Sequence, residues 1–284
     1  MGMMSAAVLF LTAMNAAIKI IGPDYHPAQV AFVRNLIAAV VIVPFILKSG
    51  GGRVLRTRRP WAHAARSLGG VIGNILFFYS FVRLPLVEVM VISQAVPVIV
   101  ALLAAMILKE KVGWRRWGAI VTGFIGVIVT IDPVGSVEPA TWAAVGGTAL
   151  WAGTILMMRS LGRTESPYAV AFYYMVTGTI MTAALQPWIW QSIPWGTYIL
   201  FFAAGVFGAF GQILMTYALK VADASVVSPF NYTAILWGLL FDLAIWGGGP
   251  TSNTIWGAAI ITAAGLYLFR REALHRVRKN NNKV

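Results

Sequence analysis

The chain has 284 residues, of which 59% are hydrophobic and 11% are charged, and its mean hydropathy is +0.77. A soluble protein of this length cannot bury so much apolar surface, so the composition excludes one and indicates an integral membrane protein. Cysteine is absent, which excludes disulfides, thiol catalysis and cysteine metal sites.

The apolar stretches predict an all-α integral membrane fold, because a helix of about 17 to 25 apolar residues is long enough to cross a bilayer. We expect ten spanning helices, at residues 3–21, 27–47, 62–82, 85–107, 114–131, 139–158, 167–187, 196–219, 224–246 and 254–270. The first stretch lacks the basic start and the small-residue cleavage site of a signal peptide, so we expect it to be retained as a spanning helix.

The net charge of +13 is concentrated on alternate connections between these helices. Most of the 22 basic residues follow the second, fourth, sixth, eighth and tenth helices, the last group lying in a polar tail at 271–284 that we expect to be disordered. By the positive-inside rule both termini are cytoplasmic, in a multi-pass protein of the inner membrane. Orientation and contact with anionic membrane lipid explain the basic residues, so we expect no nucleic-acid partner.

The two halves of the chain share three motifs that recur about 140 residues apart. Pro-x-x-Val-Ala-Phe occurs at 27–32 and at 167–172, and Gly-Asn/Gln-Ile-Leu-x-x-Tyr occurs at 73–79 and at 211–217. The third motif pairs Trp117, Gly118 and Gly126 with Trp256, Gly257 and Gly265. Three matches in the same order indicate an internal duplication.

Each repeat holds five predicted helices, an odd number, so the second copy must enter the membrane from the opposite side. We therefore predict two inverted five-helix repeats, at 1–135 and 136–270, followed by the tail at 271–284. Such repeats usually place a substrate site near the bilayer midplane where the halves meet, and they expose it to each side in turn by rocking.

Glycine and proline residues inside the spans suggest close packing and bending. Glycines in the third, fifth and eighth spans let helix backbones approach, or leave room for a cavity. Pro97 should kink the fourth helix, and Pro229 should shape the start of the ninth. Glycines in the fifth and tenth spans would form the seam of a homodimer or pack within one bundle.

A resemblance to a known family rests on several of these residues. The run Leu-Lys-Glu-Lys-Val at 108–112 and the glycines at 118, 123 and 126 resemble the Leu-x-Glu loop and glycine helix of the EamA branch of the drug/metabolite transporter (DMT) superfamily. Arg34, Glu88 and Pro97 are also similar to that branch's pattern. The resemblance implies a ten-helix basket with a central cavity, and export, or sometimes uptake, of small metabolites. Aromatic amino acid exporters are one neighbouring group within the superfamily.

The second repeat departs from that pattern. It has Trp246 followed by three glycines where many relatives repeat the acidic loop residue, so Glu110 has no symmetry mate there.

Charged residues inside a span cost about 2.5 to 3.5 kcal/mol each and need a physical reason. Arg66, near the inner end of its helix, is expected to extend to the cytoplasmic interface. Arg34 lies roughly 10 Å from the outer end of its helix at a rise of 1.5 Å per residue. Because this depth is unfavourable for a lone charge, we expect a structural or gating ion pair there, with direct contact to a substrate as the alternative.

Three more charges, Lys19, Glu88 and Asp242, lie about 3 to 6 Å from the outer ends of their helices by the same count. Mutual pairing of these charges would form an outer gate or a fixed strut, although Lys19 alone is expected to extend to the interface. Glu88 and Asp242 are the candidates for a proton relay.

Uncharged polar and aromatic side chains within the spans fit a cavity for small, partly apolar solutes. The candidates are Asn15, Asn74, Tyr79, Ser93, Gln94, Trp151, Gln212, Tyr217, Asn231, Tyr232 and Trp237. Each serves equally well as a hydrogen-bonding contact between helices, so both roles stay open. Asn74 and Gln212 occupy matched positions of the repeats and are the strongest pair of candidates.

These observations favour a secondary transporter that exports small organic metabolites, with amino acids the first class expected. An uptake carrier, an exporter of nucleotide-like metabolites, sugars or drugs, and a channel stay open as alternatives. The chain has no Ser/His/Asp cluster, no His-Glu-x-x-His and no P-loop pattern, and its three histidines are scattered. We therefore expect no enzyme, no metal and no cofactor.

Overall fold

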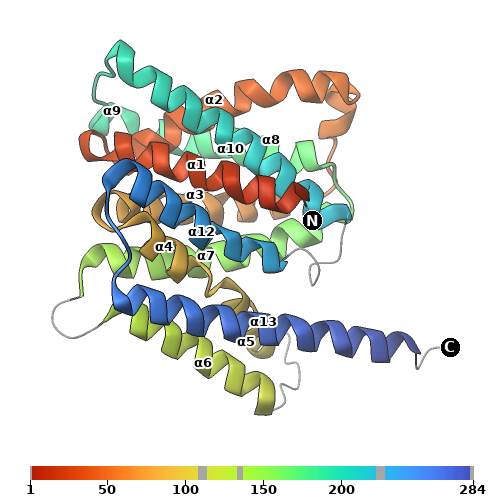
Figure 1. The fold of residues 1–284 in the computed structure, drawn as a ribbon. Helices are drawn as coiled ribbons and strands as arrows, with labels where there is room; N and C mark the ends of the chain where they lie inside the picture. The colour runs from red at the N-terminus through yellow and green to blue at the C-terminus, as the bar shows by residue number, and fades with distance from the viewer. Residues whose placement is uncertain (1, 108–113, 133–136, 222–227, 282–284) are drawn as a thin grey trace.

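The computed structural model describes the whole chain except residues 1, 108–113, 133–136, 222–227 and 282–284. The predicted Glu110 loop therefore lies outside the described residues. Within them the chain forms helices and no strand, arranged as one bundle (Figure 1). The elements are α1 Gly2–Ile21, η1 Gly22–Asp24, α2 Pro27–Lys48, η2 Gly51–Leu55, α3 Pro60–Arg83, α4 Leu86–Ser93, α5 Val96–Ile107, α6 Trp114–Ile131, α7 Pro139–Gly162, α8 Pro167–Ala183, α9 Gln186–Ile189, α10 Trp195–Val221, η3 Ser228–Tyr232, α12 Thr233–Phe241, η4 Asp242–Trp246 and α13 Ser252–Asn281.

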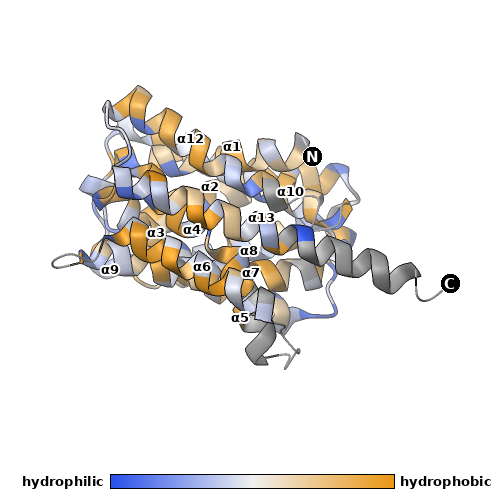
Figure 2. Cartoon of the chain, turned by 60° about the horizontal axis from the view of Figure 1, so that its bottom comes forward, coloured by the Kyte–Doolittle hydropathy of each residue, from blue (hydrophilic) through white to orange (hydrophobic). Residues whose placement is uncertain are grey.

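The described helices have the character of membrane spans. Five segments are long and apolar enough to cross a bilayer, namely Gly2–Asp24, Pro27–Lys48, Pro60–Arg83, Pro139–Gly162 and Trp195–Val221. Three shorter apolar segments are Leu86–Val100, Trp117–Ile131 and Phe230–Trp246. Figure 2 shows apolar residues along the helices and hydrophilic residues mostly near the helix ends and loops. The predicted all-helical class is confirmed, while the number of ten spans and their orientation stay predictions.

Proline residues begin several of these helices. Pro27 and Pro167 are the first residues of α2 and α8, where their missing N–H would have had no helical partner. The repeated Pro-x-x-Val-Ala-Phe motif thus starts equivalent helices in the two halves. Its valine and alanine are buried in both copies.

The predicted fourth helix is interrupted rather than merely kinked. Gln94 and Ala95 form a turn between α4 and α5 rather than part of a continuous helix. Pro97 lies in the first turn of α5 and has no N–H to donate to the carbonyl of Ser93, which is why the helix breaks here. The predicted ninth helix likewise begins with the 3-10 turn η3, which contains Pro229, and ends with the π-helical turn η4.

The expectation of a disordered tail is wrong for residues 271–281, because α13 continues to Asn281 (Figure 1). Arginine, glutamate, alanine and leucine residues dominate the stretch that follows the predicted span, and all of them favour a helix.

The main helix contacts cross from one half of the chain to the other. α1 packs mainly on α10 and α3 mainly on α7, while α2 packs on α8, α4 on α12 and α6 on α13. Exchanging equivalent helices of the two halves converts the first of these pairs into the second and leaves the other three unchanged. The contact pattern therefore has the symmetry that an internal duplication produces.

The repeated glycines explain how these helices approach so closely. A Cβ atom on Gly73 of α3 would lie 3.3 Å from Cβ of Leu150 on α7, and one on Gly211 of α10 would lie 2.7 Å from Leu11 on α1. A Cβ on Gly126 of α6 would lie 2.7 Å from Ile261 on α13. Small residues at these positions are therefore required for packing within one bundle.

Candidate functional site

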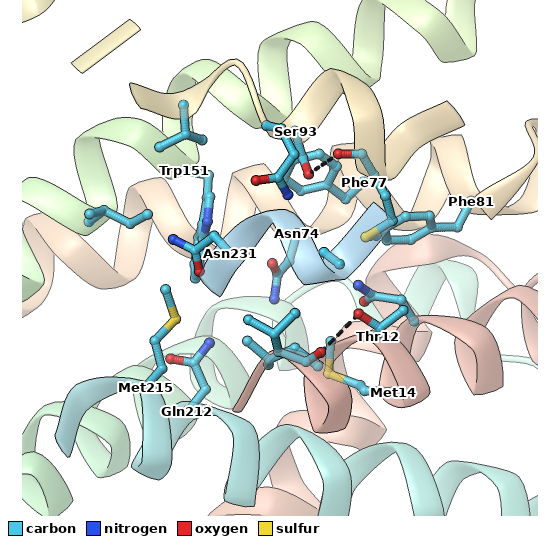
Figure 3. A pocket seen from close by; sticks show the side chains of 18 of the residues that line it. Thr12, Met14, Asn74, Phe77, Phe81, Ser93, Trp151, Gln212, Met215 and Asn231 are labelled. Atoms are coloured by element: carbon cyan, nitrogen blue, oxygen red, sulfur yellow. Dashed lines mark hydrogen bonds between the residues drawn. The ribbon is translucent and has the colours of Figure 1, made fainter. Parts of the chain in front are cut away.

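A cavity of about 130 Å³ lies among helices from both halves of the chain. Its wall is formed by α1, α2, α3 and the α4–α5 break from the first half, and by α7, α10, η3 and α12 from the second. Figure 3 shows the side chains of Asn74, Gln212 and Asn231 around this space, with Phe77 and Trp151 among the apolar groups. A few polar groups among apolar walls are typical of a site for a small organic molecule.

Residues on both sides of the helix break line the cavity wall. Ser93, Gln94, Val96 and Pro97 all line the cavity, and the Ser93 hydroxyl donates a hydrogen bond to the Met90 carbonyl at 2.7 Å. Irregular backbone inside a membrane is tolerated where it lines a cavity, and discontinuous helices often mark a solute site.

The structure brings most of the predicted cavity residues together. Those on the wall are Asn15, Asn74, Ser93, Gln94, Trp151, Gln212 and Asn231, together with the predicted ion-pair residue Arg34. The expectation that Tyr79, Tyr217, Tyr232 and Trp237 also line the cavity is wrong for this arrangement.

The two tyrosines of the repeated motif were misplaced for the same geometric reason. Tyr79 follows Asn74 by five residues and Tyr217 follows Gln212 by five, which turns each ring about 140° away from its amide on a helix with 3.6 residues per turn. Arg83 covers the ring of Tyr79 at 3.8 Å, and Tyr168 packs edge-on against Tyr217 at 5.8 Å.

Tyr232 and Trp237 are held in the packed core. Tyr232 belongs to a cluster with Val87, Val91 and Ile261, and Trp237 packs against the main core.

Asn74 and Gln212 are each held by a buried group from the opposite half. The Asn74 Nδ2 atom donates to the hydroxyl of Tyr174 on α8, and Gln212 Oε1 accepts from Arg66 Nη2 at 3.1 Å. In the described part of the chain, Asn74 Oδ1 and Gln212 Nε2 have no hydrogen-bond partner. Each amide is therefore fixed at one end and free to bind a solute at the other.

Arg66 does not extend to the interface, so that expectation is wrong. Its side chain is fully buried, and its guanidinium carbon lies 4.4 Å from the ring centre of Tyr174. Arg66, Gly70 and Asn74 are spaced four residues apart and share one face of α3, which carries Arg66 inward. This spacing was the signal in the sequence that could have placed it.

Arg34 does not form the expected ion pair among the described residues. Its Nε donates to Met14 Sδ at 3.2 Å and its Nη1 donates to Asn35 Oδ1. Arg34 is 1% exposed and lies on the cavity wall. Sequence reasoning gave no role to Tyr174 or Asn35, because an isolated tyrosine or asparagine in a span does not reveal its neighbours.

Lys19 pairs with Asp242 rather than extending alone to the interface. Lys19 Nζ lies 3.1 Å from Asp242 Oδ1 and 4.5 Å from the ring centre of Trp246. The other carboxylate oxygen of Asp242 accepts a hydrogen bond from the Val87 N–H at 2.7 Å, at the start of α4. Asp242 therefore ties α1 and α4 to the end of α12. Glu88 has no hydrogen bond or ion pair within the described residues.

Further polar contacts between the halves lie near the same end of the bundle. The side chain of Gln29 and the backbone of Gln191 exchange two hydrogen bonds, at 2.6 and 3.0 Å. The Ser80 hydroxyl also donates to the Ala140 carbonyl at 2.7 Å.

The opposite end of the bundle has its own contacts between the halves. The Thr57 hydroxyl donates to Glu165 Oε1 at 2.9 Å. Arg59 donates to the carbonyl and the hydroxyl of Ser160. Each end of the bundle is thus held by hydrogen bonds that join the first half to the second.

We predict that Gly208→Ala disturbs the cavity wall. A Cβ atom at this position would lie 3.0 Å from both Arg34 Nε and Met14 Sδ. Overpacking a tight contact costs about 1 to 3 kcal/mol, so the melting temperature in detergent should fall. Gly153→Ala is the matched control, because nothing lies within 4 Å of its Cβ position. An equal melting temperature for the two variants would show that the wall is not tightly packed at Arg34.

The fold and the site define a class: a helical membrane protein with a small cavity between its two halves, in which a few polar groups lie among apolar walls. The EamA-like transporter family matches residues 1–131 and 139–270, and the chain belongs to this family. The resemblance seen in the sequence is therefore confirmed, and the chain is a multi-pass membrane protein of the drug/metabolite transporter superfamily.

Named relatives cover most of the chain. It is 30% identical to the riboflavin transporter of Vibrio cholerae, over 89% of this chain and 86% of that one. It is 28% identical to the S-adenosylmethionine uptake transporter of Rickettsia prowazekii, again over 89% and 86%. It is 25% identical to the pseudopaline exporter of Pseudomonas aeruginosa, over 90% and 91%.

A solved crystal structure shares the fold, with a TM-score of 0.64 and 17% identity over 94% of this chain and 98% of that one.

Proposed function

We propose that the chain is a secondary transporter of the inner membrane that moves small organic metabolites through the central cavity by alternating access. The observation that carries this proposal is the pair Asn74 and Gln212. They occupy matched positions of the repeated motif, come from opposite halves of the chain, and line one cavity. Each presents one unpartnered amide atom among the described residues.

The contacts at the two ends of the bundle support alternation. Rocking of one half against the other requires that the contacts at one end break while those at the other end hold. The Lys19–Asp242 and Gln29–Gln191 contacts would close one end, and the Thr57–Glu165 and Arg59–Ser160 contacts the other. With both termini cytoplasmic, as the basic loops predict, the first set faces outward.

We propose amino acids as the first solute class to test and export as the first direction. The relatives are named for S-adenosylmethionine uptake, riboflavin and pseudopaline export, so uptake and other metabolites are the alternative. Their range of solutes indicates that direction and specificity depend on side chains of the individual cavity.

The test is counterflow in proteoliposomes that contain the purified protein. Liposomes preloaded with an unlabelled solute should transiently accumulate the same labelled solute from outside, because a carrier exchanges one molecule for another. The panel comprises neutral and aromatic L-amino acids, S-adenosylmethionine and riboflavin, each with and without a pH gradient. Saturable counterflow of any of them supports a carrier. Flux that does not saturate and shows no counterflow would indicate a channel and would contradict the proposal.

A further inference from the structure

Two buried arginines lie together beside the cavity. Arg34 and Arg66 come from α2 and α3, and their side chains are 1% and 0% exposed. Both guanidinium groups lie over the ring of Tyr174, with their central carbons 6.0 and 4.4 Å from its centre. Arg34 lines the cavity directly, whereas Arg66 reaches the wall through its hydrogen bond to Gln212.

Glycines shape the space around this arginine–tyrosine cluster, which we define as Arg34, Arg66 and Tyr174. A Cβ atom on Gly208 would lie 3.0 Å from Arg34 Nε, and one on Gly70 would lie 2.9 Å from the Tyr174 ring. Glycines on α10 and α3 therefore leave the space that the cluster occupies, and larger side chains at these two positions would displace it.

The cluster has no counter-charge in the described part of the chain. The partners of the two guanidinium groups are Met14, Asn35, Phe78, Tyr174 and Gln212, and none of these is a carboxylate. Arg66 Nε and Nη1 are buried without an acceptor, and Arg34 Nη2 also has no hydrogen-bond partner among the described residues.

A buried charge without a partner is strongly unfavourable, so an intramembrane arginine normally faces an anion or a water-filled space. Here the space that Arg34 faces is the cavity, which indicates that the missing anionic group arrives with the solute.

The amides beside the cluster present complementary groups. Arg66 holds Gln212 by its oxygen, which leaves the Gln212 nitrogen as a donor for an anion. Tyr174 holds Asn74 by its nitrogen, which leaves the Asn74 oxygen as an acceptor for an N–H group. A planar carboxylate matches the geometry of a guanidinium group through two parallel hydrogen bonds.

We propose that the cavity selects solutes that carry a carboxylate, and that Arg34 binds this carboxylate with Gln212 as the second donor. The proposal rests on the transport function proposed above and names its solute class. Arg66 and Tyr174 are positioning residues, because they act through the amides that they orient. The positive field of Arg66 also reinforces that of Arg34.

The test compares a carboxylate with its uncharged amide. Labelled L-phenylalanine counterflow is measured in proteoliposomes, with unlabelled L-phenylalanine or L-phenylalaninamide as the competitor. A hydrogen bond to a charged group strengthens binding, so L-phenylalaninamide, which lacks the carboxylate, should compete about tenfold to hundredfold more weakly than L-phenylalanine. Arg34→Gln should make the acid and the amide compete equally. Arg58→Gln, at an exposed loop residue, is the matched control and should keep the wild-type preference.

Arg34→Lys provides a second variant in case the glutamine variant does not fold. It keeps the charge but loses the planar fork, so it should retain a reduced preference for the acid. Equal competition by acid and amide in the wild type would overturn the proposal, as would an unchanged preference in Arg34→Gln. Counterflow of riboflavin alone would also overturn it but would leave the carrier function intact. No counterflow of any solute would overturn both.

Discussion

Asp242→Leu is expected to lower the free energy of unfolding by about 3 to 5 kcal/mol, because it leaves the charge of Lys19 without its partner in a mostly buried site. Asp242 is 3% exposed and accepts hydrogen bonds from both Lys19 Nζ and the Val87 N–H. The substitution therefore removes an ion pair and a cap of α4 at once. Thermal or denaturant unfolding in detergent measures the loss.

A double-mutant cycle separates the two contributions. Lys19→Met combined with Asp242→Leu removes both charges, so it should recover much of the stability that the single Asp242→Leu change loses. The cost that remains in the double variant reports the lost cap of α4. Asp24→Asn, at an exposed acid, is the control and should change stability by less than about 0.5 kcal/mol. Additive effects of the two single changes would show that Lys19 and Asp242 do not interact.

Gln212→Ala should lower the free energy of unfolding by about 2 to 3 kcal/mol, because Gln212 is the hydrogen-bond acceptor of the buried Arg66 guanidinium. It should also reduce counterflow at least tenfold, since it removes one of the two matched amides. Gln212→Glu tests the same contact from the other direction. Its carboxylate can pair with Arg66, so this variant should fold, while an added negative charge on the cavity wall should weaken binding of a carboxylate solute.

Two outcomes for Gln212→Ala would contradict the assignment of the site. Gln212→Ala with wild-type stability would show that Arg66 does not depend on Gln212. A stable Gln212→Ala variant with unchanged counterflow would show that the matched amides do not bind the solute.

Helix α3 shows how much of the site the sequence could predict. Residues 66, 70, 74, 77 and 81 follow helical spacing, and the structure places Asn74, Phe77 and Phe81 on the cavity wall. The repeat in the sequence singled out Asn74 correctly as a wall residue. It misplaced Tyr79, because a motif records which residues recur and not which face of the helix they occupy.

The partners of charged residues were harder to predict than their depth. Counting along the helices correctly placed Lys19 and Asp242 near the same end of the bundle, where the structure shows them paired across 223 residues of sequence. The same counting gave Arg34 an ion pair that the described residues do not contain. Depth along a helix can be counted from the sequence, but the neighbour across a helix interface depends on tertiary packing.

The duplication predicted two related halves but not how they contact each other. The structure shows that each helix packs chiefly on a helix of the other half, with repeated glycines at Gly73 and Gly211 allowing the approach. The break after α4 was predicted only in part. Pro97 indicates a kink in the fourth helix, but the sequence does not show whether the helix bends or stops there. The continuation of α13 was missed because polarity was interpreted as disorder.

The central claim is that one site is exposed to each side of the membrane in turn. Thiol labelling of the cavity tests this claim most directly. Because the chain has no native cysteine, Ser93→Cys places a single thiol on the cavity wall with little change in size. In proteoliposomes of known orientation, a membrane-impermeant maleimide should label this thiol from either side, and a transported solute should slow the labelling. Asp242→Leu should increase labelling from the outer side and decrease it from the inner side. Labelling that rises from both sides together, or that no transported solute affects, would contradict the account.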